Sequence, residues 1–231
     1  MLEKLKKSVC NANLELVNQG LVILNWGNAS GIDRKKGLIV IKPSGADYNS
    51  LKPSDMVVVD LKGKIIEGKL RPSSDTPTHL ELYNHFKDIG GVVHTHSEWA
   101  VSWAQAGLNI PALGTTHADH FYGDIPCTRK LTKKEIESNY EVETGKVIVE
   151  TFRKISPIDM PGVLVNCHGP FAWGSSPEDA VKNAVILEEV AKMAFRTLKL
   201  KDVSTIDQWL LDKHFLRKHG KKAYYGQKKV R

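Results

Sequence analysis

Two histidines that lie two residues apart are the first feature of the sequence that could do chemistry. His94 and His96 stand at the end of a short apolar run bounded by glycines, which is typical of a buried strand. Side chains at positions i and i+2 of a strand point to the same face, so the two imidazoles should project together as two ligands of one metal ion. Alone the pattern is weak, because many strand-end histidines only form hydrogen bonds.

A third histidine could complete this candidate metal site. His168 also lies where a short apolar run, residues 163–166, meets a glycine. Three histidines leave coordination positions open on a metal ion. This is the pattern of a catalytic zinc site rather than a structural one.

Three segments rich in small and polar residues could hold a phosphate. They are residues 26–31, 42–45 and 71–76, and the last precedes Pro77, a typical first residue of a helix. Hydroxyls, free backbone N–H groups and the ammonium of Lys42 are groups that bind phosphate. The chain has no Gly-X-Gly-X-X-Gly or Walker-type loop, which disfavours a nucleotide. A metal beside a phosphate anchor indicates a small phosphorylated metabolite, with the metal as Lewis acid on a carbonyl or hydroxyl.

Hydrophobic periodicity predicts the elements that must position these residues. Helices are expected over 2–18, 77–87, 98–106, 132–138, 177–198 and 205–219. Strands are expected over 21–24, 38–41, 56–60, 65–68 and 163–166 and around His94, with a loop at 26–31 and an interruption at 144–146. We interpret residues 1–231 as a single α/β domain with a mixed sheet and a basic C-terminal tail from about residue 220.

Composition narrows the class of protein. The chain has 231 residues, of which 41% are hydrophobic and 26% charged, as in an ordinary globular domain. It has no apolar run long enough to cross a membrane and no signal-type N-terminus. Three widely spaced cysteines form no disulfide framework. We therefore expect a cytoplasmic protein without a membrane partner.

The formal charge of +7 comes from the C-terminal end of the chain. Eight Lys and Arg and no Asp or Glu lie between Lys213 and Arg231, so the remainder is close to neutral. Such a tail could bind nucleic acid, stabilise a helix end or meet an anionic substrate. The aromatic signatures of a nucleic-acid module are absent, and we expect no nucleic-acid partner.

Seven motifs, in order along nearly the whole chain, resemble the class II sugar-phosphate aldolase/epimerase family. They are WGNAS at 26–30, KPSG at 42–45, RPSSDTPTH at 71–79, HTHS at 94–97, GTTHAD at 114–119, CHGPFAWG at 167–174, and KHG at 218–220 with AYYGQ at 223–227. The resemblance is greatest to the branch of the family that epimerises a ketopentose phosphate. It implies a three-layer α/β/α domain with a mostly antiparallel sheet, assembled as a homotetramer with active sites at subunit interfaces.

The resemblance also implies the activity and the residues that carry it. The activity is that of an isomerase of pentose catabolism, such as arabinose or ascorbate degradation. It converts L-ribulose 5-phosphate to D-xylulose 5-phosphate by breaking and re-forming the C3–C4 bond. Zn²⁺, or Mn²⁺ or Co²⁺ in its place, is implied at His94, His96 and His168, with Asp75 at or near the metal. Proton transfer is implied for Asp119 and for Tyr225 of a neighbouring subunit, and phosphate binding for Gly27, Asn28, Lys42, Ser44, Gly45, Ser73 and Ser74.

Other interpretations of these residues remain open. An aldolase of the fuculose- or rhamnulose-phosphate type would share the histidines, but those enzymes carry Glu where Asp75 stands. A non-catalytic binding module of the same fold would lack the metal histidines. Asp119 could serve only a turn, and Ser73 and Ser74 could serve only as helix caps. Only the family motif favours Tyr225 over Tyr224.

Overall fold

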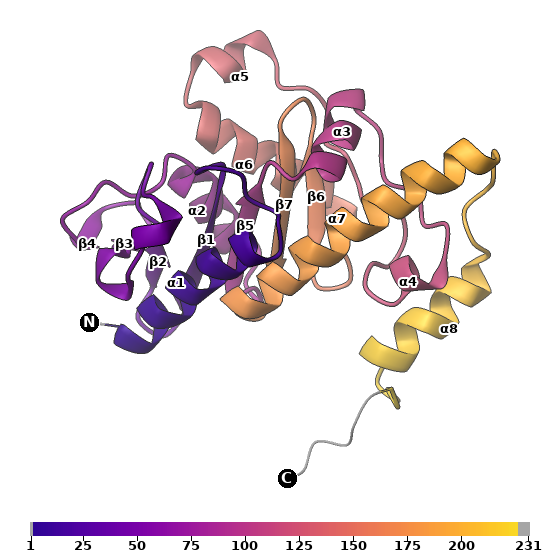
Figure 1. Cartoon of the computed structure of the whole chain (residues 1–231), viewed down its shortest axis with the longest axis horizontal. Helices are drawn as coiled ribbons and strands as arrows, with labels where there is room; N and C mark the ends of the chain where they lie inside the picture. The colour runs from indigo at the N-terminus through magenta and orange to yellow at the C-terminus, as the bar shows by residue number, and fades with distance from the viewer. Residues whose placement is uncertain (1, 226–231) are drawn as a thin grey trace.

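Seven strands form one antiparallel sheet at the centre of the molecule (Figure 1). The computed structural model describes residues 2–225. In the described chain the strand order is β4-β3-β2-β1-β5-β7-β6, and every pairing between these strands is antiparallel. The strands are β1 Gly27–Asp33, β2 Leu38–Ile41, β3 Val57–Asp60, β4 Ile65–Glu67, β5 Gly91–Thr95, β6 Gly162–Val165 and β7 Gly169–Gly174.

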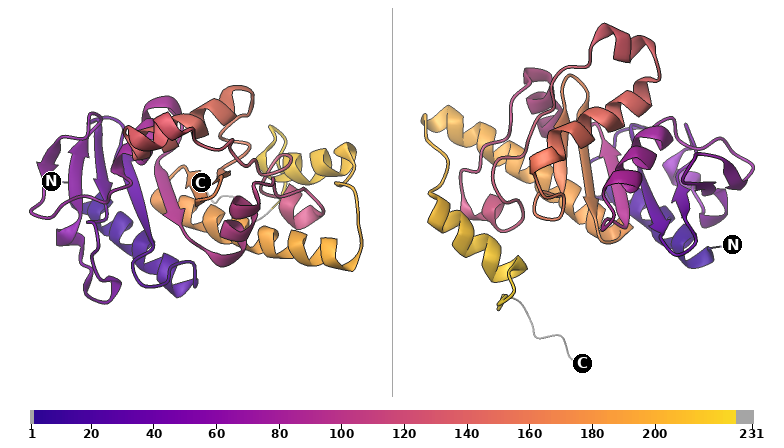
Figure 2. Two further views of the ribbon diagram at one scale, coloured as in Figure 1. Left: turned by 90° about the horizontal axis from the view of Figure 1, so that it is seen from above. Right: turned by 180° about the vertical axis from the view of Figure 1, so that it is seen from behind.

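Helices cover both faces of the sheet and make the expected three layers. One layer holds α1 (Glu3–Asn18), α7 (Pro177–Leu200) and α3 (Glu98–Ala106), and α2 (Thr76–His85) and α6 (Tyr140–Thr151) pack together on the opposite face (Figure 2, right). The remaining helices are α4 Thr115–Ala118, α5 Lys133–Glu137 and α8 Gln208–His219, with 3-10 turns at Tyr48–Ser50, Pro53–Asp55 and Phe152–Lys154. The α/β class and the mostly antiparallel sheet are confirmed, whereas the mixed sheet is not found among the described strands.

The strand expected at 21–24 and the loop expected at 26–31 are wrong. Residues 21–24 have no regular structure, and the small-residue segment is part of β1, the central strand of the sheet, which pairs with β5. The small side chains serve packing rather than a turn. A Cβ at Gly31 would lie 2.7 Å from Cγ of Pro177 and 2.9 Å from Cδ1 of Leu5, so the close approach of α7 and α1 to β1 at this position requires glycine.

The interruption expected at 144–146 is also wrong, because α6 passes through it unbroken. Gly145 lies where α6 packs tightly on α2: a Cβ there would lie 2.5 Å from Cβ of Glu81. The glycine therefore permits helix packing and does not end the helix. The predicted capping box of Thr132 and Glu135 is confirmed at the start of α5.

Helices α4 and α8 lie together at one end of the molecule, beyond the sheet (Figures 1 and 2). No helix within residues 2–225 is both long and apolar enough to cross a membrane. The last part of the expected AYYGQ motif, Gly226 and Gln227, and the basic residues Lys228, Lys229 and Arg231 lie outside the described residues.

Candidate active site

Three histidines converge at one end of the central strands. In the pairing of β5 with β1 and β7, His94 stands opposite Asn28 and Phe171, and its ring stacks on Phe171 with centroids 4.2 Å apart. The tight turn between β6 and β7 carries His168 back toward β5. One potential ligand atom each from His94, His96 and His168 lie within 4.8 Å of one another. Nε2 of His94 and Nε2 of His96 are 3.1 Å apart.

The protonation of these imidazoles suits metal binding. Nδ1 of His94 lies 3.0 Å from the carbonyl oxygen of Pro170, so an Nδ1–H donates there and Nε2 keeps its lone pair. Burial and the neighbouring imidazoles lower the pKa of His168 to about 3, and burial lowers the pKa of His96 as well. Imidazoles with free lone pairs, held at the ends of rigid strands, fit a divalent ion such as zinc.

Asp75 lies beside the histidines but does not converge with them. It precedes α2, and its Oδ2 accepts a hydrogen bond of 2.7 Å from Nδ2 of Asn28. Burial raises the pKa of this carboxyl, but His94, His79 and the Asn28 hydrogen bond outweigh burial and leave the pKa below its usual value. Direct coordination of the metal by Asp75 stays a prediction.

A buried polar stripe connects Asp75 to the core. Asp75, His79 and Tyr83 are four residues apart along α2 and face β1, where Ser30 Oγ lies 2.7 Å from Nδ1 of His79 and 2.9 Å from the Tyr83 hydroxyl. Within residues 2–225, Nε2 of His79 and Oδ1 of Asn28 are buried without a hydrogen-bond partner. Ser30 lies in the predicted 26–31 segment without an assigned role, and Tyr83 is not among the predicted site residues; the spacing of four along α2 is the signal that could have found the tyrosine.

The predicted phosphate-binding segments lie side by side. The backbone N–H of Ser44 donates to the carbonyl of Arg71, and that of Ser73 to the carbonyl of Lys42, at 2.9 and 3.0 Å. Gly27 and Asn28 belong to the adjacent strand β1. Lys42 is only 2% exposed, has no carboxylate partner within the described residues, and its Nζ lies 4.5 Å from the centre of the Tyr48 ring. Burial lowers its pKa. A buried ammonium without an acidic partner fits an anionic ligand.

Asp119 and Tyr225 form a second cluster with α8. The Asp119 carboxylate accepts hydrogen bonds from Arg217 and Lys218 and lies 3.0 Å from Nδ1 of His214. Burial raises the pKa of Asp119, but the hydrogen bonds from Arg217, His214 and Lys218 outweigh burial and lower it to about 2. The Tyr225 ring packs under Arg217 and Lys218, at 4.8 and 4.5 Å.

This cluster, here named the Asp119 cluster (Asp119, His214, Arg217, Lys218 and Tyr225), is separate from the histidines. No hydrogen bond, ion pair or ring contact in the described part of the chain joins it to them. It belongs to the end of the molecule formed by α4 and α8 (Figure 1), whereas His94 lies in β5, His96 directly after β5, and His168 in the turn between β6 and β7. The structure therefore brings the three predicted histidine ligands together and places the predicted phosphate-binding segments side by side, but the predicted proton-transfer residues lie apart from the histidines.

Comparison with known proteins agrees with this geometry. Residues 7–195 match the family described as Class II Aldolase and Adducin N-terminal domain, and the chain belongs to this family. An L-fuculose 1-phosphate aldolase is similar at 25% identity, with a TM-score of 0.78, over 91% of this chain and 94% of that one.

Two further structures show the same fold. An L-fuculose-1-phosphate aldolase from Thermus thermophilus matches at 24% identity and a TM-score of 0.65, over 87% of this chain and 98% of that one. YgbL from Klebsiella pneumoniae is named as a candidate aldolase/epimerase/decarboxylase. It matches at 24% identity and a TM-score of 0.72, over 92% of this chain and 99% of that one. With its histidine triad, the chain is an enzyme of the class II aldolase/epimerase family, with metal-dependent sugar-phosphate chemistry.

Proposed function

We propose that the protein interconverts L-ribulose 5-phosphate and D-xylulose 5-phosphate, the activity of an L-ribulose-5-phosphate 4-epimerase. The observation that carries the proposal is the convergence of His94, His96 and His168 beside Asp75. A divalent ion bound there supplies a Lewis acid that makes the bond between C3 and C4 of a ketose easier to break. The resemblance to epimerases at Asp75 and in the Tyr-Tyr tail motif favours epimerisation over net cleavage.

The chain's own residues bind and orient the substrate. Ser44, Ser73 and Ser74 offer hydroxyls and Gly45 a backbone N–H to the phosphate, and Lys42 offers a charge that has no acidic partner within the described chain. The phosphate end would thereby be fixed while the other end of the sugar reaches the histidines. Anchoring a non-reacting group in this way orients the reacting bond.

Proton transfer is proposed for Asp119 and Tyr225. The depressed pKa keeps Asp119 ionised at neutral pH, which is the form of a general base. Because the Asp119 cluster does not contact the histidines of its own chain, we propose a homotetramer in which it completes the site of a neighbouring subunit. The large exposed side chains of α8 and its end, Trp209, Leu216 and Tyr225, support an interface there.

An aldolase is the second candidate, since the similar structure at 25% identity is an L-fuculose 1-phosphate aldolase. The two activities differ in their products. We expect Zn²⁺-loaded protein, given L-ribulose 5-phosphate, to accumulate D-xylulose 5-phosphate, followed by ¹³C NMR. Chelator treatment should abolish this conversion, and Zn²⁺ should restore it. Accumulation of dihydroxyacetone and glycolaldehyde phosphate without the epimer would overturn the proposal in favour of an aldolase.

A further inference from the structure

The three metal-binding histidines differ in how their second ring nitrogen is held. Nδ1 of His94 has a backbone partner, the carbonyl of Pro170. Nδ1 of His168 instead lies 3.2 Å from the hydroxyl of Tyr140, the first residue of α6. Tyr140 belongs to none of the sequence motifs above, and nothing in its spacing points to the metal site.

We infer that Tyr140 is a positioning residue of the metal centre. Its hydroxyl accepts the Nδ1–H of His168 and thereby holds this imidazole in the tautomer whose Nε2 is free to face His94 and His96. Partners of this kind fix the ring orientation and raise the basicity of a metal-binding histidine. The inference rests on the proposed function, because it takes the three histidines to be metal ligands.

The position of Tyr140 is set by the contact between α6 and α2. The hydroxyl of Thr78 on α2 donates to the carbonyl of Glu141, the residue after Tyr140, at 2.6 Å. One turn further along α6, Gly145 lets the two helices meet without a side chain between them. The helix that begins beside Asp75 therefore also fixes the start of the helix that carries Tyr140.

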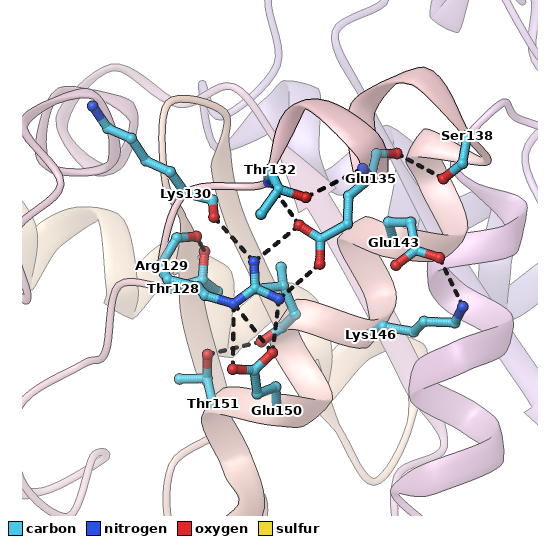
Figure 3. Close-up of polar contacts among 11 residues, drawn as sticks. Thr128, Arg129, Lys130, Thr132, Glu135, Ser138, Glu143, Lys146, Glu150 and Thr151 are labelled. Carbon is cyan, nitrogen blue, oxygen red and sulfur yellow. Dashed lines mark hydrogen bonds and ion pairs between the residues drawn. The ribbon is translucent and has the colours of Figure 1, made fainter.

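An arginine fixes α6 from its other side. The Arg129 guanidinium lies between the carboxylates of Glu135 on α5 and Glu150 on α6, at 2.8 and 2.9 Å (Figure 3). Tyr140 starts α6 immediately after the corner that joins these two helices. Surface ion pairs contribute little energy singly, but a guanidinium shared by two helices restricts how the corner can move. The start of α6, and with it Tyr140, is thus held by contacts with α2 and, through Arg129, with α5.

The phenol is itself suited to this role. It is half-buried, and its ring lies at 33° to the His168 ring with centroids 6.0 Å apart. A phenol ordinarily titrates near pH 10, so the Tyr140 side chain is a neutral hydroxyl at physiological pH. A neutral hydroxyl that accepts one hydrogen bond keeps its own proton, which it can donate to a second acceptor.

The test is Co²⁺ binding to metal-free protein, followed by visible absorption, with and without Tyr140→Phe. We expect the variant to bind Co²⁺ about 10- to 100-fold more weakly than wild type. In metal-free protein, ¹⁵N NMR of the imidazoles should show the Nδ1–H tautomer of His168 in wild type and a mixture in the variant. Tyr122→Phe is the matched control, because its hydroxyl binds Asp212 on α8 and it should leave both readouts unchanged.

A second variant keeps the phenol and moves its helix. Gly145→Ala adds a methyl group that would meet Glu81 at 2.5 Å, so α6 must shift away from α2. Co²⁺ affinity should fall although alanine favours the helix. If Tyr140→Phe binds Co²⁺ as tightly as wild type and keeps the His168 tautomer, the inference is wrong while the proposed function stands. If wild-type protein binds no Co²⁺ at all, the proposed function fails first.

Discussion

The histidine site and the Asp119 cluster are built in opposite ways. His94 lies near the end of β5 and is buried, and His168 lies in the turn between β6 and β7 and is half-buried; burial keeps His168 neutral. Asp119 lies at the end of the short helix α4, is held by two cations and a histidine from α8, and is kept charged. One region is a rigid set of imidazole ligands, and the other is a network of charges.

This difference shows how the two halves of the proposed chemistry can be separated. A metal site needs fixed geometry, and strands of a sheet provide it within a single chain. A proton-transfer group must meet the substrate only in the assembled enzyme, so it can lie on a peripheral helix. Metal binding and proton transfer should therefore fail independently when each region is mutated.

Removing a histidine should have the largest effect. We expect His168→Ala to lose its tightly bound divalent metal and to lower epimerase activity on the order of 10⁴-fold, since the Lewis acid contributes several kcal/mol. Metal content by mass spectrometry and activity should fall together. His85→Ala, a change at an exposed histidine on α2, should alter neither. Retention of a full equivalent of metal by His168→Ala would exclude this histidine as a ligand.

Asp119→Asn should lower activity without removing metal. The loss of a general base is expected to reduce kcat about 10²- to 10³-fold. Metal content should stay at the wild-type level, because the carboxylate has no contact with the histidines of its own chain. A variant that lost its metal would show that the two regions are not independent. A variant with full kcat would show that Asp119 has no role in proton transfer and only forms structural ion pairs.

Lys42→Met should separate binding from stability. Without the ammonium, the KM for the sugar phosphate should rise about 10- to 100-fold, as for the loss of a hydrogen bond to a charged group. The metal-free protein should become more stable by about 1–3 kcal/mol, because a buried charge without an acidic partner is removed. Urea unfolding measures the second effect. Lys62→Met, at an exposed lysine, should change neither quantity, and a destabilised Lys42→Met would contradict this view of Lys42.

His79 should make the metal-free protein sensitive to acid. Burial lowers the pKa of His79 to about 3, whereas an unfolded histidine titrates near 6.5. Between these pH values the unfolded state binds a proton that the folded state does not. The free energy of unfolding is therefore unaffected by protonation of His79 above about pH 6.5. It falls as the pH drops toward 3, by up to about 1.4 kcal/mol per pH unit. The non-titrating His79→Gln should show a shallower slope in urea unfolding, and an equal slope would refute this assignment.

Much of the histidine site could be predicted from the sequence because it depends on local rules. The i, i+2 geometry of a strand accounts for His94 and His96, and both belong to the convergent set together with His168. The segments containing Ser44 and Ser73 are predicted to bind phosphate from their small and polar residues, and in the structure backbone hydrogen bonds join these two segments.

The remaining features depend on contacts between distant elements. The segment around Gly31 resembles a loop in sequence because it is rich in small residues. The structure shows that at Gly31 the small residue makes room for α1 and α7, which come from distant parts of the chain. The partner of Asp119, Arg217, is 98 residues away, and no local pattern pairs them. Tyr140 reaches His168 only because α6 packs on α2. Such contacts are set by tertiary packing, which periodicity does not encode.

Co-assembly of two inactive variants tests most directly whether both regions meet in one site. Chains carrying His96→Ala would be co-expressed with chains carrying Asp119→Asn, and the mixed oligomers would be assayed for epimerisation. If each site combines the histidines of one subunit with Asp119 of another, the mixture should regain roughly a quarter of wild-type activity per site, from random assortment of the subunits. Activity no higher than that of the separate variants would contradict the shared site.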